Sequence, residues 1–236
     1  AGDGFWTGWG ATIEVHNVYA INSTFASSGL GAARTGVGFT WAPTADNGLV
    51  SFRKCTARGW HDGYIIGGGA GNGYNASILF RECSKVFNGV TLTNSRKAVL
   101  DGVYMEGGDG GIAVIDNGYY TTIRDCLIFP GFAKGIDATN TTMVGTDIHG
   151  NIISLGNVAS SIGIDIASSA AFGGYNKNAV NNIIVYTAGT AGVIGIKVSG
   201  TDPRITLVGN AFDPRSPWTG AGSVKISDTS SNGVQG

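Results

Sequence analysis

Ile-Gly-Ile-Asp-Ile at 162–166 and Ile-Gly-Ile-Lys-Val at 194–198 are copies of one phrase, which also occurs as Lys-Gly-Ile-Asp-Ala at 134–138. In each copy a glycine is followed by an apolar, a polar and a second apolar residue or alanine. Comparable phrases surround five further glycines, namely Gly38, Gly63, Gly89, Gly111 and Gly222. Successive glycines of the eight are 25, 26, 22, 24, 28, 32 and 27 residues apart. This spacing indicates an internal repeat.

A second phrase lies between successive copies of the first. Its clearest copies end in cysteine: Ser51–Cys55, Leu79–Cys83 and Thr122–Cys126. Weaker copies occupy Val99–Val103, Asp147–Asn151, Val180–Ile183 and Thr206–Asn210. Both phrases alternate apolar and polar residues, which is typical of half-buried strands, and Gly, Asn and Ser lie between them. Short strands in a repeat of this length, without a helical pattern, predict an all-β parallel solenoid of about eight coils.

Stacked coils should align equivalent residues in columns. We expect one inward column to contain Phe52, Phe80, Leu100, Ile123, Ile148, Val180 and Leu207. We expect a second to contain Cys55, Cys83, Val103, Cys126, Asn151, Ile183 and Asn210. The three cysteines are an odd number without a C-x-x-C pair, which argues against a disulfide framework or a zinc site. We therefore interpret them as small core residues.

Composition excludes several functional classes. Charged residues make up 13% of the chain and the net charge is −1, whereas nucleic-acid affinity rests on many Lys and Arg that neutralise phosphates. No apolar stretch is long enough to span a membrane. We therefore expect no nucleic-acid or membrane partner, and no metal or cofactor. The repeat predicts one domain over residues 1–236, with 1–12 as a cap or linker and 227–236 as a tail that suggests truncation or a further domain.

These phrases resemble those of right-handed parallel β-helices with the pectate-lyase-like fold. The resemblance rests on the Gly-Ile-x-apolar phrases at Gly111, Gly135, Gly163 and Gly195 and on the Arg-x-Cys phrases at Cys83 and Cys126. In character the chain is most similar to bacteriophage tailspikes and tail fibres. That similarity implies a homotrimer, in the virion tail or extracellular, that binds and often cleaves bacterial surface polysaccharide. The calcium cluster and paired arginines of pectate lyases have no clear counterpart, so pectin chemistry is not implied.

The residues two positions after the repeat glycines predict an outward column of Thr40, Ile65, Thr91, Ala113, Asp137, Asp165 and Lys197, continued by Lys225, three positions after Gly222. Within it, Asp137 and Asp165 would lie one coil apart, at about 5 Å. A retaining glycosidase needs two carboxylates about 5–5.5 Å apart, one as nucleophile and one as acid. The alternative is a surface charge ladder in which Lys197 offsets Asp165. The sequence leaves both interpretations open.

Two other charged groups are candidates for the same chemistry. Glu106 and Asp109 lie in a glycine-rich loop and form a second possible acid–base pair. Arg81 and Arg124 belong to a mostly basic column on another face, where a guanidinium could grip the carboxylate of an acidic sugar. The alternative is a solvated face or subunit seam in which Asp101 bridges the two arginines.

Aromatic residues at the expected corners are candidates for sugar binding. Trp60 and Tyr64 belong to one corner, and Tyr119 and Tyr120 belong to another. Sugar rings stack on exposed aromatic side chains, but such side chains also anchor subunit interfaces. Either role fits the pattern.

The first functional hypothesis is a trimeric tailspike-like β-helix that binds bacterial surface polysaccharide and, if it is an enzyme, hydrolyses it as a glycoside hydrolase. Two alternatives remain open. One is a non-enzymatic structural β-solenoid of a virion or adhesin. The other is a monomeric secreted polysaccharide lyase or epimerase.

Overall fold

The computed structural model describes residues 5–7, 12–21, 36–41, 48–67, 74–79, 82–107, 110–142, 145–156, 158–168, 177–186, 193–200, 205–213 and 226–228. Within these residues every regular element is a β-strand, and the strands form three parallel sheets. The all-β class predicted from the sequence is confirmed.

Sheet A has nine strands, in the order β1 (Phe5–Thr7), β4 (Val37–Trp41), β7 (Asp62–Gly67), β10 (Asn88–Arg96), β13 (Gly111–Tyr119), β16 (Phe132–Ala138), β19 (Ile162–Ser168), β22 (Ile194–Gly200) and β25 (Ile226–Asp228). Sheet B has eight, in the order β2 (Thr12–His16), β5 (Gly48–Arg53), β8 (Tyr74–Leu79), β11 (Val99–Asp101), β14 (Thr122–Arg124), β17 (Asp147–His149), β20 (Lys177–Val180) and β23 (Ile205–Val208). Sheet C also has eight, in chain order β3 (Tyr19–Ile21), β6 (Thr56–Arg58), β9 (Glu82–Val86), β12 (Tyr104–Gly107), β15 (Leu127–Phe129), β18 (Ile152–Leu155), β21 (Ile183–Tyr186) and β24 (Ala211–Asp213).

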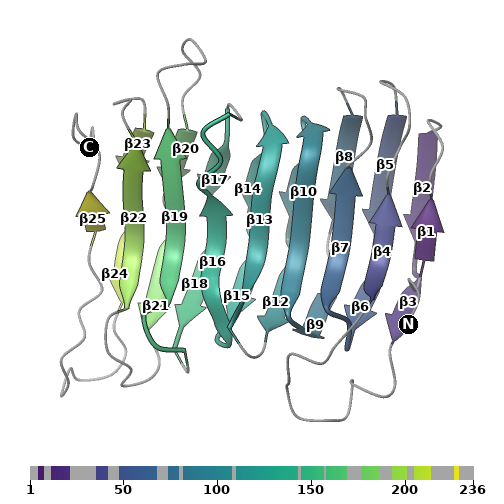
Figure 1. Ribbon diagram of the computed structural model, residues 1–236, viewed down its shortest axis with the longest axis horizontal. Helices are drawn as coiled ribbons and strands as arrows, with labels where there is room; N and C mark the ends of the chain where they lie inside the picture. The colour runs from purple at the N-terminus through teal and green to yellow at the C-terminus, as the bar shows by residue number, and fades with distance from the viewer. Residues whose placement is uncertain are drawn as a thin grey trace.

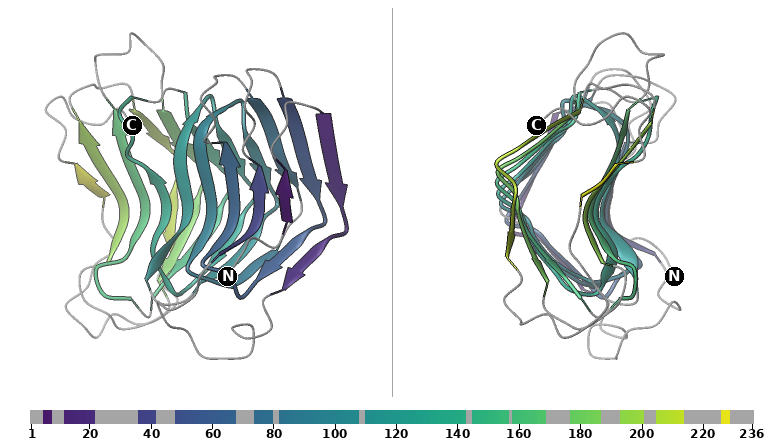
Figure 2. Two further views of the ribbon diagram at one scale, coloured as in Figure 1. Left: turned by 45° about the vertical axis from the view of Figure 1, so that its right-hand side comes forward. Right: turned by 90° about the vertical axis from the view of Figure 1, so that its left-hand side faces the viewer.

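The chain visits sheets B, C and A in turn, and each strand pairs in parallel with the strand three places later. The coils therefore stack along one axis, with β1 and β25 at opposite ends of sheet A (Figure 1). Seen along that axis, the strands of each sheet superpose to form the walls around the interior (Figure 2). The eight strands of sheets B and C confirm the predicted parallel solenoid of about eight coils.

One register column of sheet B corresponds to the first predicted column, with two corrections. The aligned residues are Val15, Phe52, Ile78, Leu100, Ile123, Ile148, Ala179 and Leu207. Ile78 takes the place predicted for Phe80, because the match between two Arg-x-Cys phrases put that coil two residues out of register. Ala179 takes the place predicted for Val180, which lies one residue further on and so points to the other face.

The corner between sheets B and C is a two-residue turn that repeats from coil to coil. Its first residue adopts a left-handed conformation, with φ of 52° at Asp125 and 68° at Gly150. Its second residue points inward, and Cys55 and Cys126 occupy this position with no exposed surface. Cys83 is also buried, but it lies in β9 and aligns with Met105, which corrects its predicted column. All three thiols are free, as the interpretation of structural cysteines requires.

In the later coils this corner holds a ladder of asparagines. Asn151 Nδ2 donates to Asn182 Oδ1 at 2.9 Å, and Asn182 Nδ2 donates to Asn210 Oδ1 at 3.0 Å. Asn182 Nδ2 also donates to the Ile148 carbonyl, and Asn182 Oδ1 accepts the backbone N–H of Asn151. The ladder includes Asn182 instead of the predicted Ile183, which is 40% exposed in sheet C.

The repeated glycines lie in sheet A where successive coils come closest. A Cβ on Gly135 would lie 2.5 Å from the Gly163 carbonyl oxygen, and one on Gly163 would lie 2.5 Å from that of Gly195. Glycine is therefore required by close approach of the backbones. The fourth position of the column belongs to Ala113 and not to the predicted Gly111, because a Cβ on the preceding Gly89 would meet Ala113.

The corner between sheets A and B buries charged groups. Asp116 is 1% exposed and accepts hydrogen bonds from Thr121 Oγ1 at 2.9 Å and Thr146 Oγ1 at 2.7 Å. Burial raises the pKa of Asp116, although these hydrogen bonds oppose the rise. Lys177 is 2% exposed and donates to the Ala138 carbonyl at 2.6 Å. Burial lowers the pKa of Lys177 to about 8, against the attraction of Asp116.

Candidate functional site

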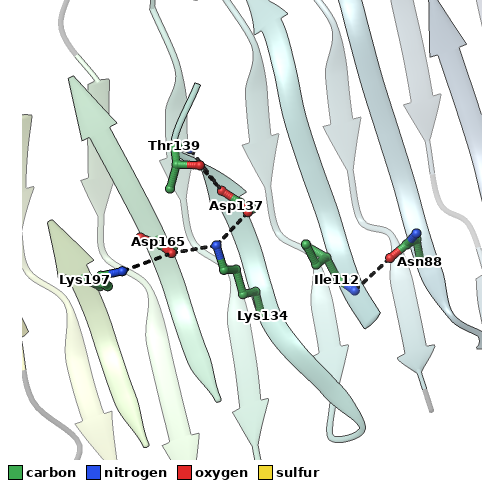
Figure 3. Close-up of polar contacts among 7 residues, drawn as sticks. All are labelled: Asn88, Ile112, Lys134, Asp137, Thr139, Asp165 and Lys197. Atoms are coloured by element: carbon green, nitrogen blue, oxygen red, sulfur yellow. Dashed lines mark hydrogen bonds and ion pairs between the residues drawn. The ribbon is translucent and has the colours of Figure 1, made fainter. Parts of the chain in front are cut away.

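The predicted carboxylate pair is in register on the outer face of sheet A. Asp137 of β16 aligns with Asp165 of β19, and Asp165 aligns with Lys197 of β22. A second lysine lies between the two carboxylates (Figure 3). Lys134 Nζ is 2.8 Å from Asp137 Oδ2 and 2.7 Å from Asp165 Oδ2, while Lys197 Nζ is 3.8 Å from Asp165 Oδ2. The four side chains form one alternating ion-pair cluster.

Two members of the predicted outward column are different in the structure. Ile115, and not Ala113, aligns with Asp137, because the phrase at Gly111 is offset by two residues from its neighbours. At the other end, Ser227 aligns with Lys197 where Lys225 was predicted. The acidic pair itself is unaffected by either correction.

The charge on Asp137 is held by its neighbours. Burial alone would raise its pKa, but hydrogen bonds from Lys134 and from the Thr139 side chain and backbone outweigh that effect and lower it. Lys134 loses solvation in the same cluster, yet its hydrogen bonds to both carboxylates raise its pKa. Asp165 has 2% of its side chain exposed, and its Oδ1 is buried without a hydrogen-bond partner.

This arrangement limits what the pair can do chemically. Both carboxylates lie within 2.8 Å of one nitrogen, so their nearest oxygens are close enough for a retaining glycosidase. Such an enzyme also needs one carboxyl group that carries a proton, whereas Asp137 is held ionised. Asp165 is buried and paired with both Lys134 and Lys197. The geometry therefore favours the charge-ladder interpretation over the catalytic pair.

The outer face of sheet C carries an aromatic pair beside a carboxylate. Tyr104 in β12 and Phe129 in β15 have ring centroids 4.9 Å apart at an angle of 37°. Phe129 is 41% exposed. Glu106 lies two residues after Tyr104 on the same outward face and aligns with Phe129. Asp109, its predicted partner, lies outside the described residues.

Aliphatic side chains extend this aromatic pair along the axis. Tyr104 aligns with Leu127, Leu127 with Ile152, and Ile152 with Ile183. The three aliphatic residues are each 40% exposed. Together with Phe129 these residues form a contiguous exposed patch, which we call the sheet C patch. Contiguous exposed apolar side chains are typical of interaction surfaces, so this patch is a candidate contact surface.

The predicted aromatic corner at Trp60 and Tyr64 requires a correction. Tyr64 has no exposed surface, because it points inward from β7, stacks on Phe39 with centroids 4.8 Å apart and donates its hydroxyl to the Cys55 carbonyl. It is therefore a core residue and not a sugar platform. Trp60 is half-buried, and its indole N–H donates to the Ala20 carbonyl at 2.9 Å.

The second aromatic corner is more open. Tyr120 is 41% exposed and has a φ of 55° at the corner between sheets A and B. The Arg96 guanidinium lies over the Tyr119 ring, 5.5 Å from its centroid. This stacking covers one face of the Tyr119 ring. Tyr120 is therefore the more exposed of the two tyrosines.

The predicted basic column contains one ion pair within the described residues. Arg124 Nη2 lies 2.7 Å from Asp101 Oδ2, one coil away, as expected. Leu79 of β8 holds the place predicted for Arg81, owing to the same two-residue offset as Phe80. Arg81 itself lies outside the described residues.

Sequence reasoning missed Lys134, Tyr104 and Phe129. Lys134 stands where the next two coils have isoleucine, so a comparison of aligned phrases contained the signal. Tyr104 and Phe129 lie in sheet C, whose short strands follow the second phrase and were not assigned separately. Their position in the fold could have been predicted only by recognising a third strand in each coil.

Metal-binding clusters and membrane-spanning helices are both absent from the described residues. These residues hold no group of three or more His, Cys, Asp or Glu side chains arranged to bind a metal ion. None of them belongs to a helix that is long and apolar enough to cross a membrane.

Three sheets wound in parallel around one core, with side-chain ladders between coils, define a parallel β-helix protein. The sequence agrees: residues 38–212 match the family described as the right handed beta helix region, and the chain belongs to that family. No curated protein matches the chain, and no solved structure matches it.

Proposed function

We propose that the protein is a tailspike-like β-helix that binds bacterial surface polysaccharide on the sheet C patch. The observation that carries the proposal is the Tyr104–Phe129 pair beside Glu106. The C–H faces of sugar rings pack on aromatic side chains, and a carboxylate accepts hydrogen bonds from sugar hydroxyls. Because aliphatic side chains continue the patch along the axis from this pair, a linear polymer would have room to extend over successive coils.

The binding proposal is tested with Phe129→Ala and a matched control. Ile152 lies on the same face with 40% exposure, against 41% for Phe129, and is not aromatic. A panel of purified bacterial capsular and O-antigen polysaccharides would identify a ligand, followed by calorimetry. Phe129→Ala should weaken binding about three- to tenfold, the range expected from one aromatic contact. Ile152→Ala should weaken it less. Equal effects, or no ligand in the panel, would contradict the proposal.

Assembly is a separate part of the same proposal. By similarity to tailspikes, three chains would associate, and the protein would reside in the virion tail or outside the cell. Light scattering behind a sizing column should give a mass near three times 24.2 kDa. A monomer mass would contradict the trimer while leaving the glycan measurement meaningful.

Hydrolysis of a glycan segment that reaches the outer face of sheet A is a second candidate, favoured by the close spacing of the Asp137 and Asp165 oxygens around Lys134. In this role Asp137, already ionised, would be the nucleophile, and substrate would have to displace Lys134 from Asp165. The test is release of reducing ends by the Asp137→Asn, Asp165→Asn double variant. Activity should vanish there and persist in Asp101→Asn, which alters an ion pair on another face. Unchanged activity in the double variant would exclude the pair.

A further inference from the structure

Each histidine of the chain has a carboxylate neighbour, but the three pairs differ in how firmly the carboxylate is held. The pairs and their N–O distances are His16–Glu14 at 3.4 Å, His149–Asp147 at 3.1 Å and His61–Asp62 at 2.8 Å. The shortest pair lies at the corner between sheets C and A, away from both groups described above. In that pair alone, among the described residues, a further side chain binds the carboxylate.

Asp62 is the middle of a hydrogen-bond chain with one possible direction. The Ile112 backbone N–H donates to Asn88 Oδ1 at 3.0 Å (Figure 3). Because that oxygen is thereby identified, the Asn88 amide nitrogen must be the atom that donates to Asp62 Oδ1 at 2.8 Å. An ionised carboxylate only accepts hydrogen bonds, so His61 Nδ1 donates to Asp62 Oδ2. The neutral imidazole therefore carries its proton on Nδ1 and a lone pair on Nε2.

The imidazole is also fixed in position. The His61 carbonyl accepts the backbone N–H groups of Phe87 and Asn88 at 3.0 and 2.8 Å, which ties this corner to the next coil. The Phe87 ring lies against the imidazole with centroids 4.9 Å apart. The His61 side chain is 35% exposed, and Nε2 has no hydrogen-bond partner among the described residues. A lone pair on a rigid, oriented ring is thus available to solvent.

His149 provides an internal comparison. Its side chain is also 35% exposed and its Nδ1 also faces a carboxylate. Asp147, however, is 44% exposed at its side chain and has no further hydrogen bond from a side chain in the described region. The two histidines match in exposure and differ in the support of their partner.

We propose that His61 is the general base of an esterase site, with Asp62 and Asn88 as positioning residues. Nε2 takes a proton from a water molecule, and the resulting hydroxide attacks the carbonyl carbon of an ester. The tetrahedral intermediate then expels the alkoxide as the C–O bond breaks, and the imidazolium returns its proton to that oxygen. The products are a carboxylic acid and an alcohol, and the imidazole is regenerated.

The chemistry of the His61–Asp62 pair favours esters over glycosidic bonds as substrates. Cleavage of a glycosidic bond requires protonation of the leaving oxygen and a carboxylate beside an oxocarbenium-like centre. Ester hydrolysis by water needs a base of moderate strength with an oriented lone pair, which a carboxylate-held imidazole supplies. Acyl groups on the sugar hydroxyls of a surface polysaccharide are the natural esters of this class. That identification rests on the proposed function, whereas the esterase chemistry does not.

The test uses the full chain and p-nitrophenyl acetate, so that it is independent of glycan binding. His61→Gln should lower kcat/KM roughly 100-fold, within the range of general-base contributions. Asp62→Asn should lower it at least about tenfold, since an amide no longer enforces the Nδ1–H tautomer. His149→Gln should leave it unchanged. A wild-type rate no higher than that of His61→Gln, or an equal loss in His149→Gln, would overturn the proposal.

Measuring the tautomer of His61 distinguishes a positioning role of Asn88 from a purely structural one. In ¹⁵N NMR spectra of the imidazoles, His61 should show the Nδ1–H form in the wild type. Asn88→Ala should reduce the fraction of that form while the thermal melting of the chain is retained. An Nε2–H form of His61 in the wild type would overturn the proposal whatever the esterase rate.

Discussion

The two corners that flank sheet B bury polar side chains in opposite ways. At the corner between sheets B and C, Asn151 and Asn182 belong to a neutral ladder in which each amide binds the next. At the corner between sheets A and B, Asp116 and Lys177 are ionisable groups with little exposure. The first arrangement gives the same bonds at any pH, whereas the stability supplied by the second depends on protonation. One coil architecture therefore contains a corner whose stability is independent of pH and a corner whose stability depends on pH.

The largest effect is expected from breaking the neutral ladder at its centre. Asn182→Leu removes the donor to the Ile148 carbonyl and the acceptor for the Asn151 N–H, and leaves both buried. Each orphaned group costs about 1–3 kcal/mol, so the free energy of unfolding should fall by about 3 kcal/mol or more. Urea denaturation measures this free energy of unfolding. Asn210→Leu is the control, because Asn210 is half-buried and is the last ladder member among the described residues. An equal loss there would contradict the ladder interpretation.

A somewhat smaller effect is expected from the pH dependence of the charged corner. Because the pKa of Lys177 is about 8 in the folded chain and 10.5 for free lysine, the unfolded chain binds more protons between these values. Stability should therefore rise with pH over this interval, by at most about 3 kcal/mol. Lys177→Met should abolish that rise, and Lys197→Met, on the outer face, should not. Persistence of the rise in Lys177→Met would assign it to another group.

The smallest effect is expected from an ion pair outside the core, one residue before the corner between sheets B and C. Arg124 binds Asp101 on the outer face of sheet B, and 44% of the Arg124 side chain is exposed. A double-mutant cycle with Arg124→Gln and Asp101→Asn should give a coupling energy of about 0.2–1 kcal/mol. A coupling as large as the loss in Asn182→Leu would show that burial is not what distinguishes the corners.

The fold was predictable because it repeats. Column positions followed from alternation, and the register of Asp137 against Asp165 was correct. Errors arose where a phrase resembled its neighbours but was displaced: Phe80 and Arg81 by two residues, Val180 by one. A displacement of one residue turns a side chain to the opposite face, and no local pattern reveals it.

The candidate sites were less predictable, because they depend on contacts between coils. Lys134 neutralises the acidic pair from a position that the two adjacent coils fill with isoleucine. Tyr64 looked like a corner aromatic, yet it lies inside β7. The direction of the Asn88 amide follows only from its contact with Ile112 in the next coil. Such contacts depend on how the coils stack, and the sequence alone gives little indication of them.

The stacking of coils has a mechanical consequence. Each coil is hydrogen-bonded only to its two neighbours, and the strands β1 and β25 lie at opposite ends of sheet A. A force applied along the axis would therefore load one interface at a time and peel the coils off in sequence. From Gly38 to Gly195 the aligned glycine and alanine positions are 22 to 32 residues apart, so each event would lengthen the chain by roughly 70 to 115 Å. The extension trace would be a set of unequal steps, and the step lengths would report which coil had yielded.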